Sequence, residues 1–356
     1  MSTTSEADSQ SGVLPWLVRP LAEALRVQRG HALLVQGAPG SGQFEFGIAL
    51  ARAWLCESPA AERPDGLACG RCESCHLVSA DQVHPDLQVL LPEALHRALG
   101  WQRPGDAVGD GDGKKKPSEW ISINQVRFAI EFSELTRGRG RLKVVVIHPA
   151  ERMQGVAASA LLKVLEEPEG GQRFVLCCGD AAALLPTVRS RCQALVLPTP
   201  EPALAARWLA DAGLAGADVL LAASGGVPQA ALERHAQGLD AALWAQLPAR
   251  VAAGDAQALS SLSVPLVIES LQKLCHDALL AACGVAPRYF PARSVPRGAD
   301  LSRLADWGRA LQRAARHAEH PWNVPLMIEA LVQDGQRALA GEGGFDAPSD
   351  SVHSRR

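Results

Sequence analysis

The segment from Gly37 to Phe44 constrains the fold of this chain more than any other stretch. Gly37 and Gly42 have the spacing of the phosphate-binding loop G-x-x-x-x-G-K-[ST]. The apolar run 31–36 predicts a buried strand before the loop, and the Ala- and Leu-rich segment 44–55 predicts a helix after it. This order places a helix N-terminus where a phosphate can bind. The sequence therefore favours an α/β nucleotide fold, although an ordinary glycine-rich turn is also compatible with these residues.

The loop lacks the side chains that act on a nucleotide. Gln43 stands where a lysine normally reaches the β- and γ-phosphates, and Phe44 stands where a hydroxyl normally holds Mg²⁺. A neutral amide and a phenyl ring supply neither function. We therefore expect this glycine frame to be a degenerate nucleotide site.

The second half of such a site is also incomplete. The β-branched run 143–147 predicts a buried strand of a parallel sheet. An acid should follow this strand to bind the metal, but His148 and Pro149 occupy those positions, and Glu151 comes too late for the usual geometry. The loop lacks its lysine and hydroxyl, and the strand lacks its acid. These two independent losses predict that the chain neither binds ATP as a cofactor nor hydrolyses it.

Further motifs follow along the chain. Residues 161–168 are Leu-Leu-Lys-Val-Leu-Glu-Glu-Pro, the run 174–178 predicts a strand, and residues 187–192 are Thr-Val-Arg-Ser-Arg-Cys. With the degenerate loop, these motifs resemble the clamp-loader branch of the AAA+ family. Within that branch the chain is similar to the δ′ subunits of bacterial DNA polymerase III, over residues 14–340.

The resemblance implies a domain organisation. We expect an AAA+ parallel sheet with helices on both faces in residues 1–199, a helical lid in 200–241 and an all-helical oligomerisation collar in 242–340. Alternating strand and helix patterns up to residue 199 agree with the first of these. Residues 1–12 and 341–356 are expected to be disordered tails.

The resemblance also implies a function. A δ′ subunit joins γ/τ and δ subunits in a hetero-oligomeric ring that uses ATP to load the sliding clamp onto primer–template DNA. The chain would then belong to a DNA-directed DNA polymerase (nucleotidyltransferase) holoenzyme without hydrolysing ATP itself.

In this family the arginine of the Ser-Arg-Cys motif acts in trans on the ATP of the adjacent subunit, a role that corresponds to Arg191. Without the resemblance, pairing of Arg191 with a surface carboxylate would be the favoured interpretation. Pro228 takes the place of a phosphate-contacting lid arginine.

Four of the nine cysteines, Cys56, Cys69, Cys72 and Cys75, form a separate constellation. Closely spaced thiolates on a turn that contains Gly70 can converge on a tetrahedral Zn²⁺ ion. Residues 1–12 lack a secretory signal pattern, which makes disulfides the weaker interpretation. Four thiolates leave no open coordination position, so we expect a structural zinc, as in δ′ subunits; redox-active or free thiols are the alternatives.

The remaining cysteines and apolar residues suggest packing. We expect Cys177, Cys178, Cys275 and Cys283 to be buried, as free cysteines usually are. Four apolar residues near the end of the collar are expected to face the core or a partner: Leu326, Ile328, Leu331 and Val332.

Composition limits the other functions. The net charge is −3, so the chain has no basic field of the kind that drives independent DNA binding. The basic stretches 114–116 and 137–141 are expected to be solvated loops, and whether they touch DNA stays open. No apolar run is long enough to span a membrane, and we expect a cytoplasmic protein.

Two alternative functions stay open. One is an active γ/τ-like ATPase, against which Gln43, Phe44, His148 and Pro149 all count. The other is a zinc-knuckle nucleic-acid-binding protein. Only 16 of 356 residues are Phe, Trp or Tyr, which leaves few platforms on which bases could stack.

Overall fold

The computed structural model describes residues 13–28, 30–80, 82–99, 101, 117–139, 142–168, 170–317 and 323–340. The chain divides into two compact units, with the boundary between Leu204 and Ala205. The expected tails and the basic stretch 114–116 lie outside the described residues.

The first unit is built on a parallel sheet of five strands. The strands are β1 (Ala32–Gln36), β2 (Leu87–Leu90), β3 (Lys143–Ile147), β4 (Gln172–Cys178) and β5 (Gln193–Val196). Their order is β2-β3-β4-β1-β5, and every neighbouring pair is parallel. The predicted α/β fold class is therefore confirmed, and the strand that precedes the glycine loop lies near the centre of the sheet.

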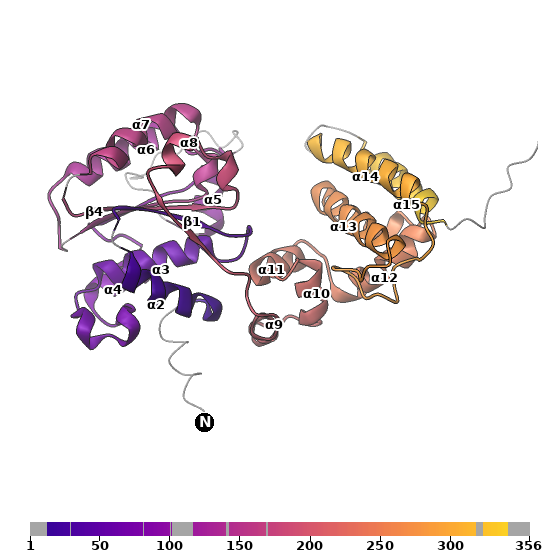
Figure 1. Ribbon diagram of the computed structural model, residues 1–356, viewed down its shortest axis with the longest axis horizontal. Helices are drawn as coiled ribbons and strands as arrows, with labels where there is room; N and C mark the ends of the chain where they lie inside the picture. Colours follow the sequence, from indigo (N-terminus) through magenta and orange to yellow (C-terminus); the bar gives the residue numbers. More distant parts are fainter. Residues whose placement is uncertain are drawn as a thin grey trace, which may run out of the picture. The chain divides into compact units, whose positions relative to one another are not determined.

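Helices cover both faces of this sheet (Figure 1). On one face α3 (Gln43–Leu55) lies against the strands, with α2 (Val18–Val27) and α4 (Glu73–Ser79) packed on it. On the other face lie α6 (Ile123–Glu134) and α7 (Gly155–Glu166), with α8 (Pro186–Arg189) against α7. The unit also contains α5 (Glu93–Leu99) and short 3₁₀ turns at Pro15–Leu17, Ala60–Glu62, Pro64–Gly66, Ala150–Arg152 and Ala181–Ala183.

Alternation along the strands produces two apolar layers. Leu34, Val145 and Phe174 are fully buried in the core shared with α6 and α7. Because successive strand residues point to opposite faces, their neighbours face α3. There the helix lies so close to β4 that a Cβ on Gly47 would lie 2.7 Å from the Cys177 sulfur, which explains the glycine at this position.

The parallel sheet also decides where the functional loops meet. All strands run in one direction, so the loops that leave their carboxyl ends lie at the same edge of the sheet. The glycine loop follows β1, the His148-Pro149 segment follows β3, and Gly179 follows β4. This edge therefore holds the candidate nucleotide site.

The second unit consists of helices joined by loops, with no β-strand among its described residues. It contains most of α9 (Pro202–Asp211), then α10 (Ala217–Ala223), α11 (Pro228–Ala236), α12 (Ala241–Ala252), a 3₁₀ turn at Gln257–Leu259, α13 (Val264–Ala282), α14 (Leu301–Arg316) and α15 (Val324–Leu339). One continuous apolar core joins these helices and includes Trp244, Leu271 and Trp307. The separation of a lid from a collar at residues 241 and 242 stays a prediction.

One packing expectation in this unit is wrong, and a second is narrowed. Cys283 caps the C-terminus of α13 and is exposed, whereas Cys275 is buried as expected. Leu326 lies in the first turn of α15 with 62% of its surface exposed, while Ile328, Leu331 and Val332 are buried. For Leu326 only the core is excluded, and contact with a partner stays a prediction. Both residues lie at helix ends, where a residue can leave the core although the helical spacing continues.

None of the helices in the described part of the chain is both long and apolar enough to cross a membrane.

Candidate functional site

The glycine loop is closed by its own side chain at the position of the missing lysine. Gln43 is almost fully buried, and its amide nitrogen donates to the carbonyl oxygens of Gly37 at 2.6 Å and Ala38 at 2.9 Å. A catalytic lysine would direct its charge toward a phosphate. Here the amide instead binds the two carbonyls at the start of the loop, so its donor groups are directed into the protein.

The N-terminal segment packs on the other side of the loop. The Trp16 indole donates to the Ser41 carbonyl oxygen at 2.9 Å. Gly42 has a left-handed φ of 100°, and a Cβ there would lie 2.9 Å from the nearest Leu17 carbon and 3.0 Å from that of Leu14. Gly42 is therefore required both by its backbone conformation and by this close approach.

An aromatic cluster occupies the region where a metal would normally bind. Phe44 packs against His148 with ring centroids 5.3 Å apart and against Trp101 at 5.7 Å. Burial lowers the pKa of His148 to about 4, although its hydrogen bond with the Cys177 carbonyl raises it slightly. His148 is thus neutral at physiological pH, and the two positions that would hold Mg²⁺ in an active site contribute apolar packing.

Glu151 lies closer to this edge than its position in the sequence suggested. One carboxylate oxygen accepts from the Gly179 N–H at 2.8 Å and from the Asp180 N–H at 3.4 Å. A Cβ on Gly179 would lie 3.0 Å from Pro39 in the glycine loop and 3.2 Å from this same oxygen. The carboxylate therefore anchors the end of β4 beside the loop. Its other oxygen is buried without a hydrogen-bond partner among the described residues.

Arg191 lies outside this edge, just after α8. Its guanidinium forms an ion pair with Glu166 and donates to the Thr187 carbonyl oxygen at 2.8 Å. About a third of the side chain, 32%, is exposed. The pair with a surface carboxylate that sequence reasoning held as the alternative is thus present in this chain. The identity of the carboxylate was not predicted.

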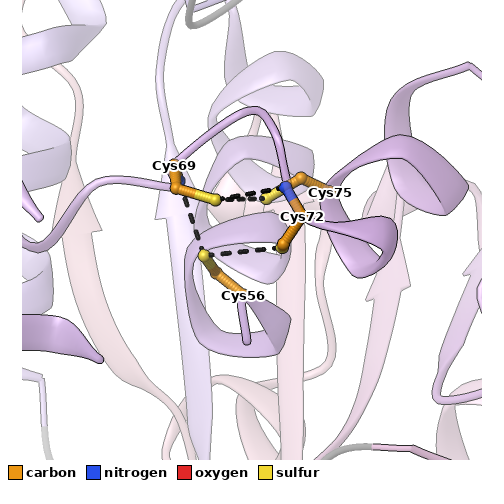
Figure 2. Close-up of side chains that lie close together, drawn as sticks. All are labelled: Cys56, Cys69, Cys72 and Cys75. Atoms are coloured by element: carbon orange, nitrogen blue, oxygen red, sulfur yellow. Dashed lines mark hydrogen bonds between the residues drawn. The ribbon is translucent and has the colours of Figure 1, made fainter. Parts of the chain in front are cut away.

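The four predicted metal ligands come together as a compact group. Cys56 ends α3, Cys69 and Cys72 flank a turn, and Cys75 lies on α4 (Figure 2). Their sulfur atoms all lie within 4.8 Å of one another, with Cys56 and Cys72 at 3.9 Å and Cys69 and Cys75 at 4.0 Å. A regular tetrahedron with Zn–S bonds of ~2.3 Å has S···S edges of about 3.8 Å, so the group fits Zn²⁺. The separations are far too long for disulfides.

Local backbone geometry favours thiolates at this group. The Cys69 N–H donates to the Cys56 sulfur and the Cys72 N–H donates to the Cys69 sulfur, each at 3.4 Å. Burial raises the pKa of the Cys69 thiol, but hydrogen bonds from Ser58 and from backbone N–H groups outweigh it and lower the value to about 5. For Cys75, burial raises the pKa to about 12. Burial thus keeps the Cys75 thiol protonated when no ion is bound. A bound dication would lower its pKa, because a metal ion stabilises every thiolate that it binds.

The cysteine group is tied to the sheet by polar contacts that sequence reasoning missed. The Arg139 guanidinium bridges Glu57 at 3.1 Å and Glu73 at 2.7 Å, one on each side of the group. The buried Ser74 hydroxyl lies 2.5 Å from the His84 Nε2, and the His84 Nδ1 accepts from the Asp86 N–H. The long sequence separation of Arg139 from both acids left no signal by which the pairing could have been found.

Comparison with known families decides the classification. A family model described as "DNA polymerase III, delta subunit" matches residues 15–201, which is more than half of the 356-residue chain. The chain belongs to this family. The match covers the glycine loop, the cysteine group and Arg191.

The names of individual relatives agree with this classification. A protein of Pseudomonas aeruginosa named DNA polymerase III subunit delta′ is 37% identical over 218 residues, which cover 60% of this chain and 58% of the relative. The protein of the same name from Escherichia coli is 35% identical over 226 residues, covering 61% and 59%. The match thus spans less than two thirds of the length of these relatives.

More distant similarities extend over nearly the whole chain. A Mycobacterium tuberculosis protein named DNA polymerase III subunit gamma/tau is 25% identical over 348 residues, covering 95% of this chain and 51% of the relative. Among solved structures, a gamma-subunit-related protein of Thermotoga maritima matches 90% of this chain and 99% of its own length, at 15% identity and a TM-score of 0.48.

At the position of the lid arginine the structure places a residue that cannot bind phosphate through its side chain. Gly225 and Gly226 have left-handed φ values of 67° and 88°, and Pro228 is the buried first residue of α11. In this family member proline therefore has a structural role at the start of a helix, where its fixed φ is well suited.

Proposed function

We propose that this chain is a non-hydrolysing δ′-type subunit of a DNA polymerase III clamp loader. It would join γ/τ and δ subunits in a ring that loads the sliding clamp onto primer–template DNA, and it would contribute to the polymerase holoenzyme without an ATPase of its own. Family membership and the names of the relatives support the assignment to this complex.

The observation that carries the non-hydrolysing part is the closed glycine loop. Gln43 binds the loop carbonyls, Trp16 binds the Ser41 carbonyl, and Phe44 packs on His148. Hydrolysis requires a cation at the phosphates and a metal with its ligands, and these positions hold neutral side chains. The degenerate site is thus filled by the chain's own residues.

We further propose that Arg191 acts in trans as an arginine finger on ATP held by the adjacent subunit. Arginine suits this role because its guanidinium is always charged and its planar fork can contact a phosphate bidentately. Arg191 is partly exposed and lies on the turn after α8, whose buried Val188 anchors this segment to the core. The backbone is therefore held while the side chain can reach beyond the surface.

A reconstituted ring tests this proposal. Arg191→Ala should leave ring assembly intact and lower steady-state ATPase in the presence of primer–template and clamp. The site that borrows the arginine should lose ~10³-fold or more, and the total rate should fall by that site's share. Arg191→Lys should restore little activity because a point charge lacks the fork. The control is Arg189→Ala, since Arg189 is also exposed and, among the described residues, its side chain makes a single 3.4 Å hydrogen bond, to the Ala181 carbonyl. Unchanged ATPase of assembled Arg191→Ala rings would contradict the proposal.

The alternative γ/τ-like ATPase has one observation in its favour. The Glu151 carboxylate lies at the end of β4 beside the glycine loop and has a buried oxygen without a described partner. It does not compensate for Gln43 and Phe44, which remove the lysine and the hydroxyl. The zinc-knuckle alternative is weaker, because the net charge is −3, aromatic residues are few, and Arg139 beside the cysteine group is held in ion pairs with Glu57 and Glu73.

A further inference from the structure

Arg191 is bound to its own chain. One terminal nitrogen pairs with the Glu166 carboxylate, and the other donates to the Thr187 carbonyl at 2.8 Å and approaches the Ser190 hydroxyl at 3.4 Å. Both ends of the guanidinium fork are therefore engaged before any neighbouring subunit is present. An arginine in this arrangement is ordered, but its charge is neutralised.

The fold brings the two residues of this pair together on one rigid body. Glu166 is the last residue of α7, and Arg191 follows α8 by two residues. The two helices pack against each other, with Leu161 and Leu165 of α7 and Val188 of α8 buried in one core. The C-terminal end of α7 also carries partial negative charge, which adds to the attraction for a cation.

The ion pair competes directly with the proposed role of Arg191. A phosphate bound in trans needs the positive charge and two free N–H groups on one edge of the guanidinium. The Glu166 carboxylate neutralises the charge and occupies one terminal nitrogen, while the Thr187 carbonyl occupies the other. Glu166 is nearly half exposed, at 48%, and ion pairs at such surfaces are weak, so the several negative charges of a triphosphate can displace it.

We infer that Glu166 is a positioning residue that holds Arg191 on its own chain until the ATP of the adjacent subunit displaces it. This inference rests on the proposed function of Arg191. Glu166 thus lowers the rate of ATP hydrolysis in rings where the ATP of the adjacent subunit does not yet contact Arg191. Once primer–template and clamp have closed the interface, the pair is already broken and the restraint is gone.

The chain offers a matched control next to Glu166. Glu167 has the same side chain, is exposed, and stands one residue beyond the end of α7. No ion pair to Glu167 is found among the described residues. Glu167→Gln therefore makes the same change in net charge as Glu166→Gln without touching Arg191.

The first measurement uses the isolated full chain. Phenylglyoxal modifies guanidinium groups, and mass spectrometry of the peptide that contains Arg191 gives its rate of modification. Glu166→Gln should raise this rate between about two- and fivefold, the factor that corresponds to a surface ion pair. Glu167→Gln should leave it unchanged. An unchanged rate in Glu166→Gln would show that the pair does not restrain Arg191 in solution.

The second measurement uses the reconstituted ring. With ATP alone, Glu166→Gln should raise the ATPase rate about two- to fivefold, and with primer–template and clamp it should match the unmodified ring. Glu167→Gln should change neither rate, and Glu166→Gln combined with Arg191→Ala should show only the low rate of Arg191→Ala. If Arg191→Ala lowers ATPase but Glu166→Gln fails to raise the ATP-only rate, the restraint is wrong while the finger stands. If Arg191→Ala has no effect, the proposed finger is wrong and this inference falls with it.

Discussion

At the scale of single residues, the positions of the glycine loop where a nucleotide site would need a cation and a metal ligand are occupied by packed neutral side chains. Gln43 completes hydrogen bonds within the loop, and Phe44 joins an aromatic cluster with His148 and Trp101. Gln43 and Phe44 are both buried, and an amide with its hydrogen bonds made and a phenyl ring suit that environment. These two loop residues therefore contribute to the packing of the first unit.

His148 gives this residue-scale view a pH-dependent consequence. Burial lowers its pKa in the folded chain to about 4, from 6.5 for an ordinary histidine. As the pH falls below 6.5 the unfolded chain binds the proton first, so stability is lost progressively between pH 6.5 and 4. The shift corresponds to on the order of 3 kcal/mol.

His148→Phe should remove that part of the acid sensitivity and keep the ring packed on Phe44. Urea unfolding of both chains at pH 7, 5.5 and 4 should show a loss of stability that is about 3 kcal/mol smaller in the variant. His84, whose pKa is also lowered by burial, stays in both chains and its contribution cancels in the comparison. Equal losses in the two chains would mean that His148 is not held neutral.

At the scale of elements, the cysteine group joins segments that have little apolar packing of their own. Between α3 and α4 the chain forms only short 3₁₀ turns, and no residue of those turns is buried. Gly70, with a left-handed φ of 72°, makes the turn that brings Cys69 and Cys72 together. A bound ion would replace the core that this segment lacks, as in other small metal-stabilised modules.

We expect about one zinc ion per purified chain at Cys56, Cys69, Cys72 and Cys75. Cys72→Ser should lower the zinc content measured by mass spectrometry. It should also lower the free energy of unfolding by about 2 kcal/mol or more. A loss of this size lowers the melting temperature by roughly 4–8 °C. Cys283→Ser is the matched control, because Cys283 is exposed and lies in the second unit. Retention of full zinc and full stability by Cys72→Ser would exclude these thiols as ligands.

At the scale of the whole molecule, the chain keeps the frame of a nucleotide-binding protein while its own site is closed. The sheet order, the glycine loop and the helices on both faces are retained. The group for which we propose a function is Arg191, which follows α8 in the same unit and is paired with Glu166. This division suits a subunit that assists a neighbour's reaction.

The purified chain alone should therefore hydrolyse no ATP above background. Gln43→Lys should not restore hydrolysis, because Phe44 still lacks the metal-binding hydroxyl and His148 and Pro149 still stand where the acid is needed. Phosphate release with Mg²⁺ and ATP measures both chains, and an active γ/τ subunit provides the positive control. Turnover by the unmodified chain would instead favour the γ/τ-like alternative.

The sequence by itself determined the features that depend on local pattern. Strand 143–147 and helix 44–55 follow from apolar runs and helix-forming composition, and they agree with β3 and α3 within one residue. The metal ligands follow from the close spacing of the cysteines and the glycine turn between them, and their sulfur atoms do converge. Burial of Cys177 and Cys178 likewise follows from the strand pattern.

Only the tertiary structure decided the contacts between distant segments. Glu166 and Arg191 meet because α7 packs on α8, and Trp16 reaches Ser41 because the N-terminal segment lies on the loop. Neither contact has a sequence signal, since a charged or aromatic residue finds its partner through the fold and not through spacing. Leu326 makes the same point in reverse, because helical periodicity was compatible with the core or a partner and only the fold leaves this side chain outside the core.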